Sequence, residues 1–177
     1  MTMKLIETKT LGSAVSSIDF TSIPQTYTDL LLLASIRTVR ANISDDIVFR
    51  YNSDAGTNYS YLSLLGTGSA VSTTGGVLNR GYFGAVCGDS ATSNTFGNGS
   101  LYIRNYTASI VKGSSHNTVN EQNSGPANQL IIAGTYSQTT AISSISLFSD
   151  NTANIMAGST VSLYGILKGS DGIVTVS

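Results

Sequence analysis

Short stretches in which apolar and polar residues alternate recur along the chain, separated by glycine, asparagine, serine or aspartate. In one such stretch, Leu101 and Ile103 alternate with Tyr102 and Arg104. A period of two places the apolar side chains on one face of a β-strand. Half-buried strands of this kind are typical of antiparallel sheets that have one face on a core. No window of the sequence sustains the 3.6-residue period of a helix over three turns.

The pattern therefore predicts an all-β protein, an antiparallel β-sandwich that is jelly-roll-like and has about 8–11 strands. Strands are expected near residues 3–11, 15–21, 29–37, 46–52, 60–66, 81–87, 100–106, 108–112, 129–136, 142–149 and 160–167. Long polar segments are expected to be loops at residues 66–80, 88–98 and 113–128.

The sequence shows no shift in composition and no internal repeat, which indicates a single domain. Residues 1–168 are expected to form a single β-sandwich domain, and residues 169–177 a C-terminal tail. Apolar residues alternate in this tail after a glycine-rich turn. The tail can therefore pair with the edge of a neighbouring subunit or add a hairpin strand to its own sheet.

Two strands are predicted to be covered on both faces, because residues 30–34 (Leu-Leu-Leu-Leu-Ala) and 130–133 (Leu-Ile-Ile-Ala) are apolar without alternation. Such strands lie either inside the stack of sheets or at a subunit contact. Tyrosines in the strands suit a protein interface or a sugar-stacking surface, with ordinary half-buried strand positions as the alternative. The resulting candidates for an interface are Leu30, Leu32, Tyr59, Tyr61 and Tyr102.

Composition excludes several classes of protein. Only 11% of residues are charged and the net charge is −1, so the chain lacks the concentrated positive face that binding to nucleic acid requires. It also lacks an apolar segment long enough to span a membrane and a basic amphipathic stretch that would bind its surface. The single cysteine precludes an internal disulfide, and with one histidine it is too little for a zinc site of soft ligands. Residues 1–7 do not resemble a secretory signal, so a soluble protein made inside a cell, with no cofactor, is expected.

Few residues are candidates for chemistry. Asp45, Asp46 and Asp54 are weak candidates for a calcium site or for the acids of a polysaccharide-degrading enzyme, with structural turn residues as the alternative. The EF-hand pattern is absent, and the two members of the Asp45–Asp46 pair point to opposite faces of a strand. His116 lies in a polar segment and is expected to be a solvated loop residue. Cys87 is expected to act as a small buried hydrophobe. No catalytic residue is assigned, and an enzyme is not expected.

Several blocks of the sequence carry more information than its composition does. They comprise residues 17–32 (SIDFTSIPQTYTDLLL), 49–60 (FRYNSDAGTNYS), 94–100 (NTFGNGS), 141–145 (AISSI) and 157–166 (AGSTVSLYGI). Together with Arg37 and Arg40, these blocks resemble a family of small virion proteins of tailed bacteriophages, notably phages of marine and freshwater bacteria. They cover most of the chain in the family's order.

The resemblance implies a jelly-roll structural component of the virion with no enzymatic activity. It implies a protein made in the host bacterial cytoplasm, assembled as a homotrimer and attached to the major capsid protein or other virion proteins. A head decoration or cement protein is the first expectation, because the sequence enters its first strand almost at once, without a stalk or an adaptor. The alternative is a tail fibre or receptor-binding tail component that contacts glycans of the host surface.

Overall fold

The computed structural model describes residues 2–123 and 125–167, which form twelve β-strands and no helix. None of the described residues therefore belongs to a helix that could cross a membrane. The strands are β1 (Thr2–Thr10), β2 (Ser17–Phe20), β3 (Asp29–Ile36), β4 (Ser44–Tyr51), β5 (Tyr59–Gly66), β6 (Val71–Leu78), β7 (Gly81–Cys87), β8 (Gly97–Ile103), β9 (Lys112–Asn120), β10 (Asn128–Tyr136), β11 (Ile145–Ser149) and β12 (Thr160–Leu167).

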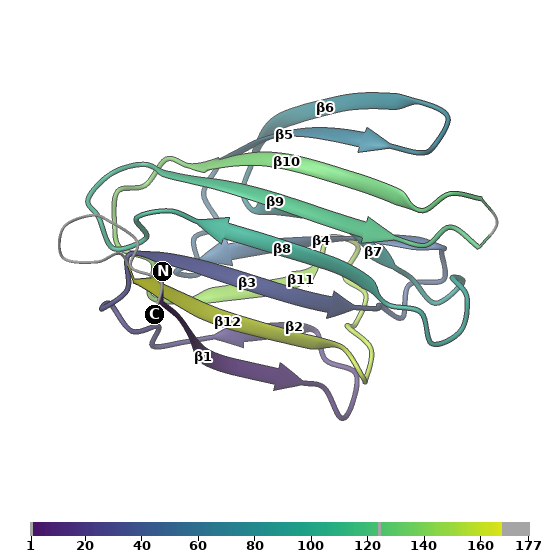
Figure 1. Ribbon diagram of the computed structural model, residues 1–177, viewed down its shortest axis with the longest axis horizontal. Coiled ribbons are helices and arrows are strands. Elements are labelled where there is room, and N and C mark those ends of the chain that lie inside the picture. Colours follow the sequence, from purple (N-terminus) through teal and green to yellow (C-terminus); the bar gives the residue numbers. More distant parts are fainter. Residues whose placement is uncertain (1, 124, 168–177) are drawn as a thin grey trace.

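The strands form two sheets of unequal width that lie face to face (Figure 1). The larger sheet has eight strands in the order β1-β12-β3-β8-β9-β10-β5-β6, and the smaller has four in the order β2-β11-β4-β7. All pairs of neighbouring strands are antiparallel. The predicted all-β sandwich is confirmed, whereas the finer jelly-roll connectivity stays a prediction. Residues 169–177, for which a pairing tail was expected, lie outside the described residues.

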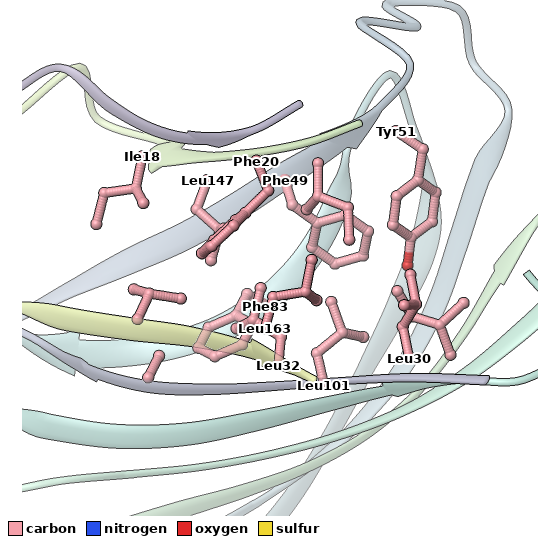
Figure 2. Close-up of a cluster of buried hydrophobic side chains, with 14 of the residues drawn as sticks. Ile18, Phe20, Leu30, Leu32, Phe49, Tyr51, Phe83, Leu101, Leu147 and Leu163 are labelled. Carbon is pink, nitrogen blue, oxygen red and sulfur yellow. The ribbon is translucent and has the colours of Figure 1, made fainter. Parts of the chain in front are cut away.

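The hydrophobic core lies between the two sheets and contains the apolar members of the alternating stretches. Ile18, Phe49 and Leu147 approach it from the smaller sheet, while Leu32 and Leu101 approach it from the larger sheet (Figure 2). Each of these five side chains is at most 2% exposed. Burying a side chain of this size contributes about 1.5–3 kcal/mol. The alternation in the sequence therefore identified the inward-facing residues of these strands.

One edge of the larger sheet extends beyond the smaller sheet. In Figure 1 the β5–β6 hairpin lies past β10, and β6 forms the far edge of the sheet. Residues 71–77 of β6 are accordingly exposed on both faces of the sheet. Because β6 covers no core, its sequence (VSTTGGVL) has no apolar alternation along its full length. The prediction of a loop over residues 66–80 was wrong for this reason.

A second strand was missed at the centre of the larger sheet. Residues 113–128 were predicted to be a loop and 108–112 a strand, but β9 begins at Lys112 and runs to Asn120. Its inward-facing residues alternate with exposed ones and are all polar: Lys112, Ser114, His116, Thr118 and Asn120. The alternation of β9 is therefore one of burial and not of hydropathy, and the sequence pattern does not show it.

A buried arginine fixes the segment between β7 and β8. Arg37 directly follows β3 in the sequence and is only 4% exposed. Its guanidinium donates hydrogen bonds of 2.7–3.0 Å to four backbone carbonyls, those of Asp89, Ala91, Thr92 and Thr95. One side chain thus donates hydrogen bonds to four carbonyls of a segment that is not part of a sheet, one of which, that of Thr92, also accepts from the Thr95 N–H at 3.2 Å.

Candidate assembly interface

The acidic candidates lie at opposite ends of one strand. Asp45 and Asp46 are near the start of β4, and Asp54 follows its end. At about 3.3 Å per residue, eight residues of strand separate the two ends by roughly 25 Å. Among the residues that the structure describes, no group of three or more His, Cys, Asp or Glu side chains is placed to hold a metal ion. The structure thus does not bring the three calcium candidates together.

Each of these carboxylates already has partners within the fold. Buried Asp45 accepts hydrogen bonds from Ser149 Oγ (2.7 Å) and Asn151 Nδ2 (2.8 Å), and it forms an ion pair with Arg40. Asp46 faces the other side of β4 and accepts a 2.8 Å bond from the Tyr82 hydroxyl, and burial raises the pKa of its carboxyl. These contacts hold β4 against its neighbours.

Asp54 stabilises the turn between β4 and β5. It accepts hydrogen bonds from the Gly56 backbone N–H (2.7 Å), Asn58 Nδ2 (2.8 Å) and the Tyr136 hydroxyl (2.9 Å). The bond from the Gly56 N–H is the main cause that lowers the pKa of the Asp54 carboxyl. The interpretation of Asp54 as a structural turn residue therefore accounts for all of its described contacts.

His116 is not a solvated loop residue, contrary to the prediction. It faces inward from β9 and is 3% exposed. Its Nδ1 donates to the Tyr82 carbonyl at 2.7 Å, which leaves Nε2 to accept the hydroxyl proton of Ser114 at 2.8 Å. Burial lowers the pKa of the imidazole to about 4. His116 is thus a neutral core residue with both ring nitrogens bonded.

We expect His116 to make the protein less stable in mild acid. Between pH 6.5 and 4 the unfolded chain binds a proton at this residue that the folded chain does not bind, so the free energy of unfolding falls as the pH falls. The free energy of unfolding is not reduced by this residue above pH 6.5, and it is about 3 kcal/mol lower at pH 4. Urea unfolding across this range checks the effect, with His116→Gln as the comparison. Asp46 and Asp54 titrate in both proteins, so parallel curves for the two proteins would contradict the prediction.

Cys87 is a buried thiol, as predicted. It lies at the end of β7 with no exposed surface, and it forms no disulfide. Burial is the main cause that raises the pKa of the thiol. A thiol that is both inaccessible and protonated is a poor nucleophile.

The structure places only some of the interface candidates at the surface. The prediction was wrong for Leu30, Leu32 and Tyr59, which are at most 2% exposed and belong to the core. Tyr61 is half-buried on the inward side of β5, where its ring lies 5.1 Å from that of Tyr82. Tyr102 is half-buried and faces outward from β8, and its hydroxyl donates to Asp29 at 2.6 Å.

The surface that stands out is the outward side of the larger sheet, which we call the outer face. The register aligns its side chains in three rows across seven strands. Within the described part of the chain, the three rows contain no charged residue. The rows are Tyr164–Leu31–Tyr102–Ser115–Ala133–Leu62–Gly75, Ser162–Leu33–Ser100–Asn117–Ile131–Leu64–Thr73 and Thr160–Ser35–Asn98–Val119–Gln129–Gly66–Val71.

Large apolar side chains are exposed on this outer face. Leu62 is 58% exposed, Ile131 54%, Leu64 45% and Leu33 40%. Small residues beside Leu33 and Val119 leave two shallow depressions of about 350 and 220 Å³, which share Asn98 and Gly99. Exposed apolar surface on this scale marks a contact site for another macromolecule. The outer face is therefore the candidate assembly interface.

The sequence contained a signal for the outer face, but the prediction assigned the wrong alternate residues of the apolar run to the surface. The run of leucines at residues 30–33 was expected to be covered on both sides, and its even members were named as interface residues. Ser35 follows on the outward side of β3, so the outward members of the run are Leu31 and Leu33. In the same way Ile131, and not Leu130 or Ile132, is the exposed member of the second apolar run.

Comparison of the chain with models of known families, with curated proteins and with solved structures finds no match. Its function is accordingly inferred from the surface of the sandwich.

Proposed function

We propose that the protein is a non-enzymatic structural component of a bacteriophage virion, and more specifically a decoration or cement protein that stabilises the head shell. The observation that carries the proposal is the uncharged outer face. Its side chains are mostly short or rigid, so they lose little conformational entropy when a partner covers them. A wide, low-charge contact of this kind suits permanent assembly better than transient binding.

The size of the outer face supports this proposal. The three uncharged rows span seven strands about 4.8 Å apart and five residues of each strand, an area on the order of 550 Å². A stable interface buries about 800 Å² on each partner, so the three rows could provide the larger part of one. The proposed partner is the major capsid protein or another virion protein. The homotrimer that the sequence blocks imply stays a prediction.

One observation favours the alternative, a tail component that binds host glycans. A groove of about 380 Å³ opens beside the end of β8, where Tyr102, Arg104, Ile110 and Val111 line it together with Ser114 and Ser115. An aromatic ring beside hydroxyls and a guanidinium suits recognition of a sugar. The outer face is the larger feature, and for that reason the head location is preferred.

Immunogold labelling of intact virions with an antibody against the protein tests the location. Gold spread over the heads is expected. Gold confined to the tails would overturn the decoration role and make the groove at Arg104 the place to search for a receptor site. Labelling of neither part, in virions whose other proteins label normally, would overturn the virion role itself.

The outer face has its own test in Ile131→Lys. Ile131 lies in the middle row, between Asn117 and Leu64. The exposed site tolerates lysine, so the free energy of unfolding should change by no more than about 0.5 kcal/mol. Burying the charge in an apolar contact costs several kcal/mol, so incorporation into virions should fall at least about tenfold in a complementation assay.

A matched control for this test is Ala55→Lys, which adds the same charge to an exposed turn after β4. It should be incorporated like the unaltered protein. Equal incorporation of the two variants would show that the outer face is not the contact surface.

A further inference from the structure

The four outer edges of the two sheets differ in how they are protected against pairing with another chain. The backbone groups of an edge strand offer a template for a further strand, and proteins normally obstruct them with charge, bulges or short strands. β1 has charges at Lys4, Glu7 and Lys9 and a bulge between Leu5 and Glu7. β2 is four residues long and contains Asp19. β7 pairs through a bulge, and Gly84 takes a φ of 132°.

β6 lacks all of these protections. Its eight residues pair with β5 without a register shift, from Tyr59–Leu78 to Gly66–Val71. Among residues 2–123 and 125–167, β5 is the only strand with which it pairs. It contains no charged residue and no proline, while Val71 is 75% and Val77 65% exposed. It also buries no core and contains Gly75 and Gly76, which weaken an isolated strand. A second partner strand would supply the stability that burial does not.

We propose that β6 pairs antiparallel with β6 of a second copy of this chain, joining two eight-stranded sheets edge to edge. The inference rests on the geometry of β6 and is independent of the virion role. A two-fold axis perpendicular to the sheet relates the copies, so each outward residue lies opposite an outward residue.

The sequence of β6 matches itself in one register of this kind. With Thr74 on the axis, Thr73 lies opposite Gly75 of the second copy, Ser72 opposite Gly76, and Val71 opposite Val77. The two valines of the strand, both exposed, then form two Val71–Val77 contacts in the dimer, and no like charges meet. Shifting the register by two residues in either direction replaces both valine pairs with contacts to glycine or polar residues. This self-complementarity selects a second copy over an unrelated strand as the occupant.

Cysteine cross-linking tests the register. In Thr74→Cys the two thiols face each other across the axis, at the Cα separation of about 4.5–5.5 Å found for opposed residues, which a disulfide can bridge. In Val71→Cys, which is also at an exposed position of the same strand, six residues of strand separate the two thiols by roughly 20 Å. The native Cys87 is buried and does not compete.

Under mild oxidation at the same protein concentration, Thr74→Cys should form a covalent dimer at least about tenfold faster than Val71→Cys. Because the readout is the covalent dimer on a non-reducing gel, it holds whether the protein is a dimer or a larger assembly. Equal rates for the two variants would overturn the proposal, as would a failure of Thr74→Cys to cross-link.

A charge test distinguishes edge pairing from stacking through the outer face. Thr74→Lys places two ammonium groups together on the axis and should lower the molar mass measured by light scattering. Asn117→Lys, at the centre of the outer face, should leave that mass unchanged. If Asn117→Lys alone dissociates the assembly, or if the unaltered protein is a monomer throughout, edge pairing through β6 is wrong.

Discussion

Replacing Arg37 with methionine should lower the free energy of unfolding by about 3–5 kcal/mol, a large part of the stability of a typical domain. Methionine fills a similar length but donates no hydrogen bond. The carbonyls of Asp89, Ala91, Thr92 and Thr95 would then lose their guanidinium partner. An unsatisfied buried acceptor costs about 1–3 kcal/mol. The Thr92 carbonyl keeps its hydrogen bond from the Thr95 N–H, and local rearrangement that admits water recovers part of the cost of the other three.

Urea unfolding measures the effect of Arg37→Met, and limited proteolysis should show that residues 88–96 become the first site of cleavage. Arg104→Met is the matched control, because Arg104 is exposed, and it should change stability by no more than about 0.5 kcal/mol. A loss for Arg37→Met as small as that of the control would contradict the role assigned to the guanidinium.

Truncating Phe49 to alanine should cost about 3–5 kcal/mol. Phe49 is 2% exposed, and its ring centroid lies 4.8 Å from that of Tyr51, 6.2 Å from that of Tyr59 and 5.5 Å from that of His116. The ring packs directly on the backbone of Gly81, where a Cβ would collide with it. Since three rigid rings and a strand backbone surround the site, the cavity left by truncation can collapse only slightly.

The control for Phe49 is Phe148→Ala. Phe148 is half-buried on β11, where the Arg50 guanidinium lies 5.2 Å from its ring centroid. Its loss should cost roughly 1 kcal/mol, as thermal or urea unfolding can show. If the two phenylalanine variants were equally stable, the ring cluster around Phe49 would not be a tightly packed part of the core.

The sequence pattern predicted those strands whose inward side chains are apolar. Alternation at Ile18 and Phe20, at Phe49 and Tyr51, and at Leu101 and Ile103 places these residues in the core, where the structure has them. Periodicity reports burial only where burial coincides with hydrophobicity. It therefore failed at β6, which is exposed on both faces, and at β9, whose buried side chains are polar.

Residues that depend on partners far away in the chain gave no local signal. Arg37 is bonded to carbonyls more than fifty residues later. Lys112 Nζ donates to the carbonyl of Thr139, 27 residues later, and to the nearby carbonyls of Ala108 and Ile110. From sequence alone a positively charged side chain is expected at the surface, since its burial is costly without partners. The acceptors that compensate this cost are brought together only in the folded chain. The apolar runs indicated the outer face. Which alternate leucines point outward, however, could be read only from Ser35, a single polar residue beyond them.

The position of the first strand has a consequence for how the chain acquires its structure. β1 pairs with β12, from Thr2 opposite Leu167 to Thr10 opposite Thr160, so during synthesis β1 waits for a strand that lies 150–165 residues later. β12 in turn connects β1 to β3. Contacts between such distant segments must overcome a large loop-closure entropy, and domains rich in them fold in milliseconds to seconds. During synthesis, Leu5 and Ile6 therefore remain without their sheet neighbour until β12 has been made.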